Sequence, residues 1–248
     1  MQLSRTAQLA QKASSQRAVI RRGSCVQTMA SAKPALKLYY FDIPGRAEAT
    51  RLLLRLGKYP FEDYLLKREE WAELKPKMPF GQVPVLEVDG KLLSQSSAME
   101  RFVAKLTDQY PSDPWEAAKV DEIAAFMGEW LDIFIPSFFI KDENEKVAAR
   151  KQVVEEKLKP KIQKLSELIE KAGPDNYLCG PKITYADVQA FVQLSFMVSG
   201  FFQGVPTDLY APYPAVRAFH ARIASLPEVV EAYKDVTEGP RATYKTLP

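Results

Sequence analysis

Histidine and cysteine are scarce in this sequence. Of its 248 residues one is histidine, His220, and two are cysteine, Cys25 and Cys179. Because Cys25 lies in an N-terminal leader-like segment, Cys179 has no partner for an internal disulfide, which fits a reducing compartment. None of these residues has the spacing of metal ligands. The sequence therefore predicts neither a disulfide framework nor a metal site, and we assign His220 no role.

Long apolar runs are also missing. No stretch reaches the roughly 18 uninterrupted apolar residues that a transmembrane helix needs. The closest, residues 188–202, contains Gln189, Gln193 and Gly200, and we expect it to form a buried helix rather than a membrane span. With 46% hydrophobic residues the chain can bury a full core in one large or two smaller domains.

Acidic residues are absent from residues 1–32, which contain five basic residues and five serines. Because the formal net charge is +3, the rest of the chain carries 3 − 5 = −2. A slightly acidic fold offers no basic surface for a phosphate backbone, so we expect no nucleic-acid partner.

The leader, residues 1–32, has the composition of a transit peptide, which predicts a plastid or mitochondrial location. Two alternatives stay open: a tail without function, and a second start at Met29 that would give a cytoplasmic form.

The first module is predicted from a strand that ends on a tyrosine. Residues 36–41 form an apolar strand, residues 42–45 a sharp turn, and residues 46–56 an amphipathic helix. A strand that leads directly into a helix projects its last side chains at the open end of a sheet, where α/β folds bind ligands. Tyr40 is therefore a candidate phenol donor, although most tyrosines at strand ends only pack.

A second motif surrounds a proline. Residues 78–90 read as a loop, a strand that opens at Pro84, and an Asp-Gly hairpin turn. A proline at this place predicts a cis bond after Val83, which exposes neighbouring backbone groups to a ligand. The helix that follows has a cap-rich start, and its N-terminus would favour a carboxylate near Gln95 and Ser96. Together these elements predict a small peptide-binding module.

The chain after a stiff linker at residues 111–114 is predicted to be entirely helical. Thr184 and Asp187 form a capping box at the start of a buried helix, so we assign Asp187 to folding rather than to catalysis. The predicted helices cover residues 115–135, 145–171 with a kink at Pro160, 188–202, 214–225 and 227–233, and the tail from residue 237 is expected to be irregular.

These motifs, in this order, resemble those of the soluble glutathione transferases, and of the sigma class in particular. Residues 37–48, KLYYFDIPGRAE, are similar to the start of that class, and PFGQVP followed by Gln95 and Ser96 is similar to its glutathione pocket. The resemblance implies an α/β plus all-α fold. It places a thioredoxin-like glutathione-binding domain at residues 34–111 and an all-helical electrophile-binding domain at residues 115–235, after the leader at residues 1–32.

The resemblance also implies roles for individual residues. Tyr40 would face the pocket and donate a hydrogen bond to the glutathione thiolate, and Tyr39 would face the core. Trp71 and Lys75 would bind the glycyl end of the peptide. Glutathione would be a co-substrate, with no permanently bound cofactor. The other implied contacts are Gly81, Gln82, Val83 and Pro84 for the cysteinyl part, Gln95 and Ser96 for the γ-glutamyl carboxylate, and Arg46 for the shape of the pocket and the subunit interface.

The family resemblance further implies a homodimer. In this class a carboxylate from the neighbouring subunit, usually Asp, reaches the glutamyl ammonium, and the matching residue here is Glu129. Members that bind a cation at the interface carry further aspartates where this chain has Ala125 and Gly128, so we expect no metal. A small hydrophobic electrophile would bind between Ile43, Pro44 and the end of the long helix, around Phe134, Pro136 and Phe138.

Three alternative functions stay open. A glutathione-dependent isomerase or peroxidase of the same class would use the same thiolate, but isomerases acting on prostaglandin endoperoxide carry a tryptophan where this chain has Pro136. A non-catalytic ligand-binding or structural relative would often lack the phenol at the end of the first strand, whereas this chain retains it as Tyr40. A thiol oxidoreductase would need a cysteine near Tyr40, and the sequence has none there.

The leader generates the first testable prediction. Fused to a fluorescent protein, residues 1–32 should direct it to an organelle, because they combine basic residues and serines with no acid. Fluorescence microscopy with organelle markers measures this. A diffuse cytosolic signal would refute the targeting hypothesis.

Overall fold

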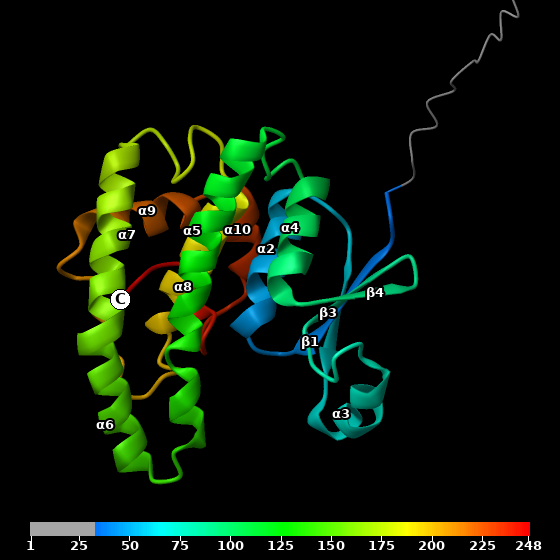
Figure 1. The fold of residues 1–248 in the computed structure, drawn as a ribbon, viewed down its shortest axis with the longest axis horizontal. Helices are drawn as coiled ribbons and strands as arrows, with labels where there is room; N and C mark the ends of the chain where they lie inside the picture. Colours follow the sequence, from blue (N-terminus) through cyan, green and yellow to red (C-terminus); the bar gives the residue numbers. More distant parts are fainter. Residues whose placement is uncertain (1–32) are drawn as a thin grey trace, which may run out of the picture. The chain divides into compact units, whose positions relative to one another are not determined.

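The computed structural model describes residues 33–248, of which Pro34–Pro248 form one compact unit. The predicted leader at residues 1–32, with Cys25 and Met29, lies outside the described residues. Figure 1 shows the described chain as a sheet with its own helices, followed by a group of longer helices.

The sheet has four strands in the order β2-β1-β3-β4. Strand β1 (Leu36–Phe41) is parallel to β2 (Glu62–Leu66) and antiparallel to β3 (Val85–Val88), which pairs with β4 (Lys91–Ser94). Side chains alternate along β1, so that Leu36, Leu38 and Tyr40 are all buried on one face. The predicted cis bond between Val83 and Pro84 is present at the start of β3.

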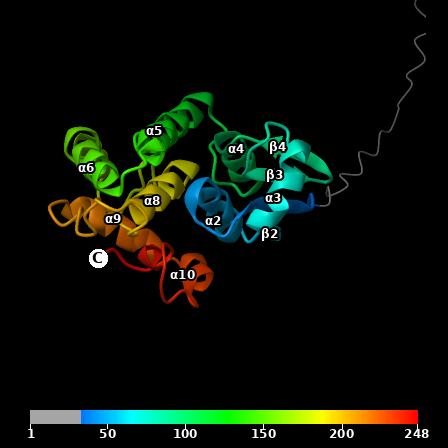
Figure 2. The same cartoon turned by 90° about the horizontal axis from the view of Figure 1, so that it is seen from below.

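Helices α2 (Glu48–Leu56) and α4 (Ser96–Leu106) pack against each other on the side of the sheet that faces the helical half (Figure 2). A short turn, η1 (Gly45–Ala47), joins β1 to α2. The sequence analysis missed β2 and α3 (Arg68–Leu74), because β2 carries two acids and α3 buries no residue, so neither has a clear apolar pattern. A second turn, η2, covers Lys75–Lys77.

The second half is entirely helical, as predicted, and together with the thioredoxin-like sheet this confirms the predicted fold class. One apolar core continues through both halves. Within residues 33–248 no helix is long and apolar enough to cross a membrane. The elements are α5 (Pro114–Asp132), η3 (Ile135–Phe139), α6 (Glu143–Val153), a π-helical turn η4 (Val154–Leu158), α7 (Lys159–Ala172), α8 (Tyr185–Met197), α9 (Pro214–Ala224), α10 (Pro227–Tyr233) and η5 (Ala242–Tyr244).

Two predicted helix ends and the predicted tail need correction. The helix predicted at residues 188–202 ends at Met197, and residues 198–202 form turns. The long helix ends at Asp132, several residues before Pro136, and a 3-10 turn follows. The predicted disruption at Pro160 is present as the π-helical turn directly before α7, because a proline has no N–H to donate to the preceding turn. The tail is not wholly irregular, since η5 buries Tyr244 completely.

The predicted capping box of Thr184 and Asp187 is present at the start of α8. The Asp187 carboxylate is fully buried and accepts hydrogen bonds from the backbone N–H of Thr184 and of Leu178, both at 2.8 Å, and from the Thr184 hydroxyl at 2.7 Å. Burial raises the pKa of Asp187, and these hydrogen bonds oppose that rise. His220 is buried as well, next to Ser195 at 2.9 Å.

We predict that Asp187→Ala lowers the free energy of unfolding by at least about 2 kcal/mol, because it leaves the Leu178 and Thr184 N–H groups without an acceptor. Chemical denaturation measures this. The control is Asp175→Ala, an exposed acid in the preceding loop, which should stay within about 0.5 kcal/mol of the wild type. Equal effects of the two substitutions would contradict the capping role.

Candidate functional site

A cavity of about 740 Å³ opens at the end of β1, between the sheet and helices α5 and α8. It brings together residues that are far apart in the sequence. Every residue predicted for the glutathione side of the site lines it except Glu129: Tyr40, Arg46, Trp71, Lys75, Gly81, Gln82, Val83, Pro84, Gln95 and Ser96.

Tyr40 places its hydroxyl at the wall of this cavity. The residue is 8% exposed, and its hydroxyl oxygen accepts a hydrogen bond from the backbone N–H of Arg46 at 3.3 Å. Within the described residues the hydroxyl donates to no protein atom. Burial raises the pKa of Tyr40, and the Arg46 N–H and the charges of Arg46 and Arg51 offset only part of this. The phenol therefore stays protonated at neutral pH and can donate its proton to a ligand.

Gly45 allows the turn after β1 to approach this phenol closely. Its φ is +44°, a left-handed conformation that side chains disfavour. A Cβ atom at this position would lie 2.6 Å from the Tyr40 hydroxyl oxygen. Glycine is thus required here for two reasons: the left-handed backbone conformation, and the clash that any Cβ atom would make with the Tyr40 hydroxyl.

The prediction that Tyr39 faces the core is wrong. Tyr39 lies on the opposite face of β1 from Tyr40, as the alternation requires, but that face is only half-buried. Its hydroxyl donates to the Glu87 carboxylate at 2.7 Å, and its ring packs against Tyr64 at 5.3 Å between centroids. Tyr40 itself shares the buried face with Leu36 and Leu38.

Two parts of the cavity lining favour anions. One is the start of α4 at Ser96, where a helix N-terminus offers free N–H groups and the positive end of its dipole. Gln95 precedes it with a φ of +72°, a backbone strain that is uncommon outside glycine and concentrates at functional sites. The other is Lys75, an exposed cation of the lining, near which Trp71 packs edge-on against Phe41 with 6.0 Å between ring centroids.

The remaining wall is apolar and comes largely from the helical half. Ile43 and Phe138 line it, as predicted. Phe134 does not, because it is fully buried against Phe202 at 4.8 Å, and Pro44 and Pro136 lie outside the lining. Leu131 and Ile135 also line it, at the end of the long helix, where the pocket was expected. Sequence reasoning missed Phe196 and Phe201, at and after the end of α8, because no local pattern signals their contribution.

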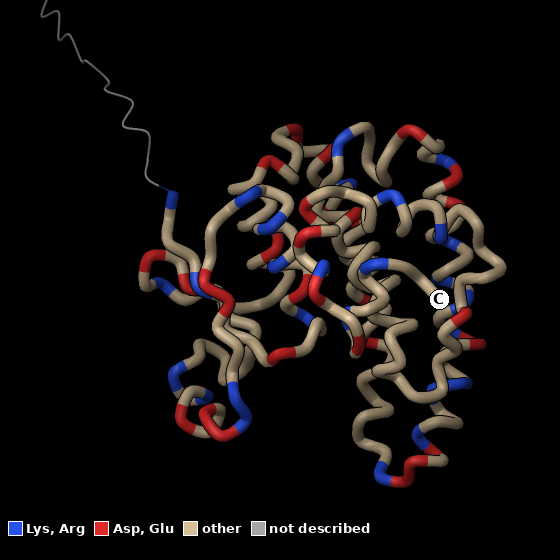
Figure 3. The backbone as a smooth tube through the Cα atoms, turned by 180° about the vertical axis from the view of Figure 1, so that it is seen from behind, with Lys and Arg blue, Asp and Glu red and all other residues tan. Residues whose placement is uncertain are grey.

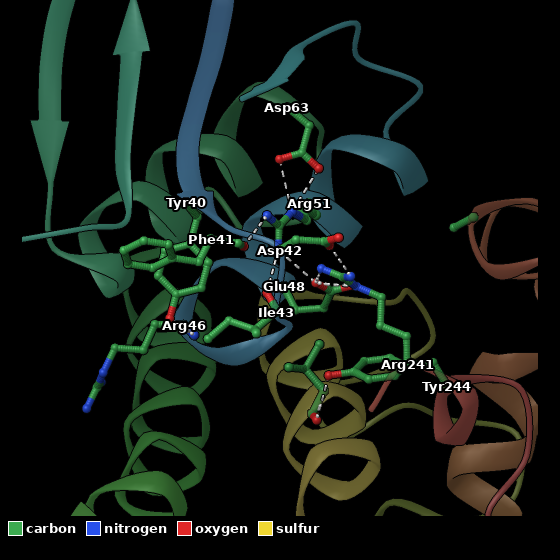
Figure 4. A network of polar contacts seen from close by, with 12 residues as sticks. Tyr40, Phe41, Asp42, Ile43, Arg46, Glu48, Arg51, Asp63, Arg241 and Tyr244 are labelled. Carbon is green, nitrogen blue, oxygen red and sulfur yellow. Dashed lines mark hydrogen bonds and ion pairs between the residues drawn. The ribbon is translucent and has the colours of Figure 1, made fainter. Parts of the chain in front are cut away.

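A buried ion network holds the turn that carries this site (Figure 4). Glu48 and Arg51 are almost fully buried and form an ion pair at 3.0 Å. Arg51 also binds Asp63 of β2 at 2.9 Å and donates to the carbonyl oxygens of Ile43 at 2.9 Å and Phe41 at 3.3 Å. The guanidinium therefore connects the end of β1, the turn and α2.

Arg241 closes this network from the C-terminal tail. It donates to Asp42 in the turn at 2.7 Å and to Glu48 at 3.2 Å. Burial alone would lower the pKa of Arg241, but the carboxylates of Glu48 and Asp42 raise it. Nothing in the sequence singled out this arginine, because its two partners lie more than 190 residues away.

Glu129 lies outside the main cavity. Its exposed carboxylate pairs with Lys161 of α7 and lines a neighbouring, smaller cavity instead. Arg46, also exposed, pairs with Asp132 at 2.6 Å. Among residues 33–248 there is no cluster of three or more His, Cys, Asp or Glu side chains that could hold a metal ion.

This geometry agrees with comparisons to known proteins. Residues 36–105 match the family model of the glutathione S-transferase N-terminal domain, and residues 128–235 match that of its C-terminal domain. The chain is 31% identical over 214 residues to glutathione S-transferase 1 of Ascaris suum, a match that covers 85% of this chain and 100% of that protein. The chain belongs to the glutathione S-transferase family. As a member it is a glutathione transferase, an enzyme with glutathione as co-substrate.

Solved structures resemble the transferase over most of its length. A prostaglandin synthase D of Nilaparvata lugens superposes with a TM-score of 0.74 at 28% identity, covering 82% of this chain and 99% of that one. A sigma class transferase of Fasciola hepatica superposes with a TM-score of 0.72 at 29% identity, covering 84% and 99%. The cavity lies between the two halves that these relatives share.

We predict that Arg241→Gln lowers kcat about tenfold with little change in the KM for glutathione, because a small displacement of the turn misplaces the Tyr40 phenol. Steady-state kinetics measure kcat and KM. The ultraviolet absorbance of the glutathione thiolate bound to the enzyme, followed against pH, measures the pKa of the bound thiol. The control is Arg217→Gln, an exposed arginine that contacts the C-terminal Pro248 away from the turn. If both variants keep wild-type kcat and thiol titration, Arg241 has no positioning role.

Proposed function

We propose that this transferase is sigma-like and that Tyr40 activates glutathione by donating a hydrogen bond to its thiolate. The supporting observation is a buried, protonated phenol at the cavity wall whose proton has no acceptor among residues 33–248. A cysteine-type thiol has a pKa of about 8.5, so little of it is thiolate at neutral pH. A hydrogen bond to the thiolate lowers that pKa and raises the concentration of the nucleophile.

In this proposal the peptide lies along the polar side of the cavity. Its γ-glutamyl carboxylate binds at Gln95 and Ser96, at the N-terminus of α4. Its glycyl carboxylate binds near Lys75 and Trp71, at the opposite end. The backbone beside the cis bond at Val83 hydrogen-bonds the central cysteinyl residue, which brings the sulfur toward Tyr40.

The second substrate in this proposal is a small apolar electrophile. Ile43, Phe138, Phe196 and Phe201 line the side of the cavity next to the phenol. Flat apolar compounds suit such a surface, since aromatic side chains offer area without polar groups that need partners. Conjugation of such a compound to the sulfur is the reaction we favour.

A second candidate is a glutathione-dependent isomerase or peroxidase. The structural relative from Nilaparvata lugens is named a prostaglandin synthase D, which supports an isomerase. Both reactions would start from the same thiolate, so they share the proposed role of Tyr40. A panel of aryl halides, organic hydroperoxides and an endoperoxide separates the three activities.

A homodimer and an organelle location complete the proposal. In a dimer, Glu129 of the neighbouring subunit would approach the glutamyl ammonium, which requires it to leave Lys161. This contact stays a prediction. The leader supports the location by its composition alone.

We predict that Tyr40→Phe lowers turnover tenfold or more while glutathione still binds, because a hydrogen bond to a charged group contributes about 1.5–3 kcal/mol. Steady-state kinetics with an aryl halide and calorimetry with glutathione measure the two effects. The matched control is Tyr39→Phe, which removes a hydroxyl from the opposite face of β1 and should leave turnover unchanged. Unchanged kinetics in Tyr40→Phe would remove the phenol from the mechanism.

A further inference from the structure

The aromatic wall of the main cavity packs on one buried ring. Three phenylalanines of the lining contact Phe202, at 6.0 Å for Phe138, 5.4 Å for Phe196 and 5.1 Å for Phe201 between ring centroids. Phe202 itself is 1% exposed and does not line the cavity. The wall comes from η3 and from the end of α8 with the turns after it. Its shape therefore depends on how η3 and these turns are held together.

Arg150 of α6 lies directly behind this wall. Its guanidinium carbon is 5.5 Å from the centroid of the Phe138 ring and 5.6 Å from that of Phe202, distances at which a ring attracts a cation. Its Nε donates to the Ser137 hydroxyl at 2.9 Å, which in turn donates to the Phe134 carbonyl oxygen at 2.7 Å. One side chain thus contacts both segments that form the wall, without lining the cavity.

The turns that carry Phe201 and Phe202 approach α6 on the face where Arg150 lies. Gly204 has a φ of +97°, and a Cβ atom there would lie 2.9 Å from the carbonyl oxygen of Val147. Val147 precedes Arg150 by three residues on α6, so the two share a face of the helix. The backbone contact and the guanidinium therefore act at the same place.

The charge of Arg150 has no carboxylate partner among residues 33–248, although the side chain is only 5% exposed. The buried Arg51, by contrast, pairs with both Glu48 and Asp63. Figure 3 shows Lys and Arg beside Asp and Glu where α6 begins, and Glu143 there pairs with Lys146. Burial lowers the pKa of Arg150, and the charge of Glu143 offsets this only in part. An uncompensated buried cation costs stability.

An apolar side chain would fill the space behind the wall without this cost, so stability alone does not account for an arginine here. We propose that Arg150 is a positioning residue that fixes the aromatic wall and so determines which electrophiles fit. It acts through Ser137 and through the rings of Phe138 and Phe202, and it does not touch the substrate. This inference rests on the proposed function, which puts the electrophile against this wall.

A fixed wall selects a class of substrate. Because Phe138 is held before the electrophile arrives, a flat and rigid aryl compound can bind without the cost of ordering the surface. Stacking on aromatic rings adds to the gain from buried area. Flexible alkyl electrophiles adapt their own shape and gain less from such a surface. The expected selectivity is therefore for aryl over alkyl electrophiles, and it should depend on Arg150.

The test uses Arg150→Met, which removes the charge and the donor but keeps an unbranched chain behind the wall. Steady-state kinetics on the full chain should show a KM for an aryl halide raised about fivefold or more, because a charged hydrogen bond and two ring contacts are lost. The KM for glutathione and the kinetics with an alkyl halide should stay near the wild-type values. Arg150→Lys, which keeps a cation beside the rings, should recover part of the loss.

Two measurements do not depend on turnover. Calorimetry should show that Arg150→Met weakens binding of S-benzylglutathione but not of S-methylglutathione, because only the benzyl group reaches the wall. Thermal unfolding should place Arg150→Met at or above the wild-type temperature, since the variant removes an uncompensated buried charge. The matched control is Arg222→Met. Arg222 also lies over a ring, that of Tyr177 at 3.9 Å, but outside the cavity lining, so its loss should leave every KM unchanged.

The inference is overturned if Arg150→Met keeps the wild-type KM for the aryl halide and the wild-type affinity for S-benzylglutathione. It is also overturned if the variant lowers the unfolding temperature and raises both KM values together, as a purely structural residue would. Should Arg150→Met not fold, Arg150→Lys decides by the same criterion: a raised KM for the aryl halide alone supports the inference, and unchanged values overturn it. A wild type that binds glutathione but converts no electrophile would instead refute the proposed function.

Discussion

The buried ion network around Arg51 is the constraint on which the site depends. Its guanidinium holds the carbonyl oxygens that end β1, and its partner Glu48 starts α2. The turn between them presents the Arg46 N–H to the Tyr40 hydroxyl. Buried charges are tolerated only with close partners, and here the carboxylates of Glu48 and Asp63 provide them. Arg241 then connects the same turn to the C-terminal tail.

A consequence of this arrangement is that both halves of the chain define the position of one phenol. The sheet supplies the strand that carries Tyr40, and the tail after α10 supplies the cation that holds the following turn. Gly45 permits the close approach, since any Cβ there would clash with the hydroxyl. Polar and apolar residues both line the cavity beside this phenol, which suits the proposed reaction between a charged peptide and an apolar compound.

Much of the glutathione side could be predicted because its residues lie in short contiguous motifs. The strand before Asp42, the cis bond after Val83 and the start of α4 each have a local signature, and all three were found. The expected side-chain cap of α4 is the exception, since Gln95 at its N-cap makes no capping hydrogen bond. The sequence analysis failed where local signals conflict with tertiary structure. Strand β2 is stabilised by pairing with β1 despite its acids, and Phe134 packs into the core although its neighbours line the cavity.

By itself the sequence determined the helix and strand periods of most elements, the capping box at Asp187 and the place of Tyr40 near the end of β1, because these depend on neighbours within a few residues. Only the tertiary structure decided which distant groups meet. It brought Arg241 to Asp42, Phe196 and Phe201 to the cavity, and Gln189 to Glu100. Contacts of this kind depend on how separate elements pack, and a residue's local pattern contains no information about its partner in another element.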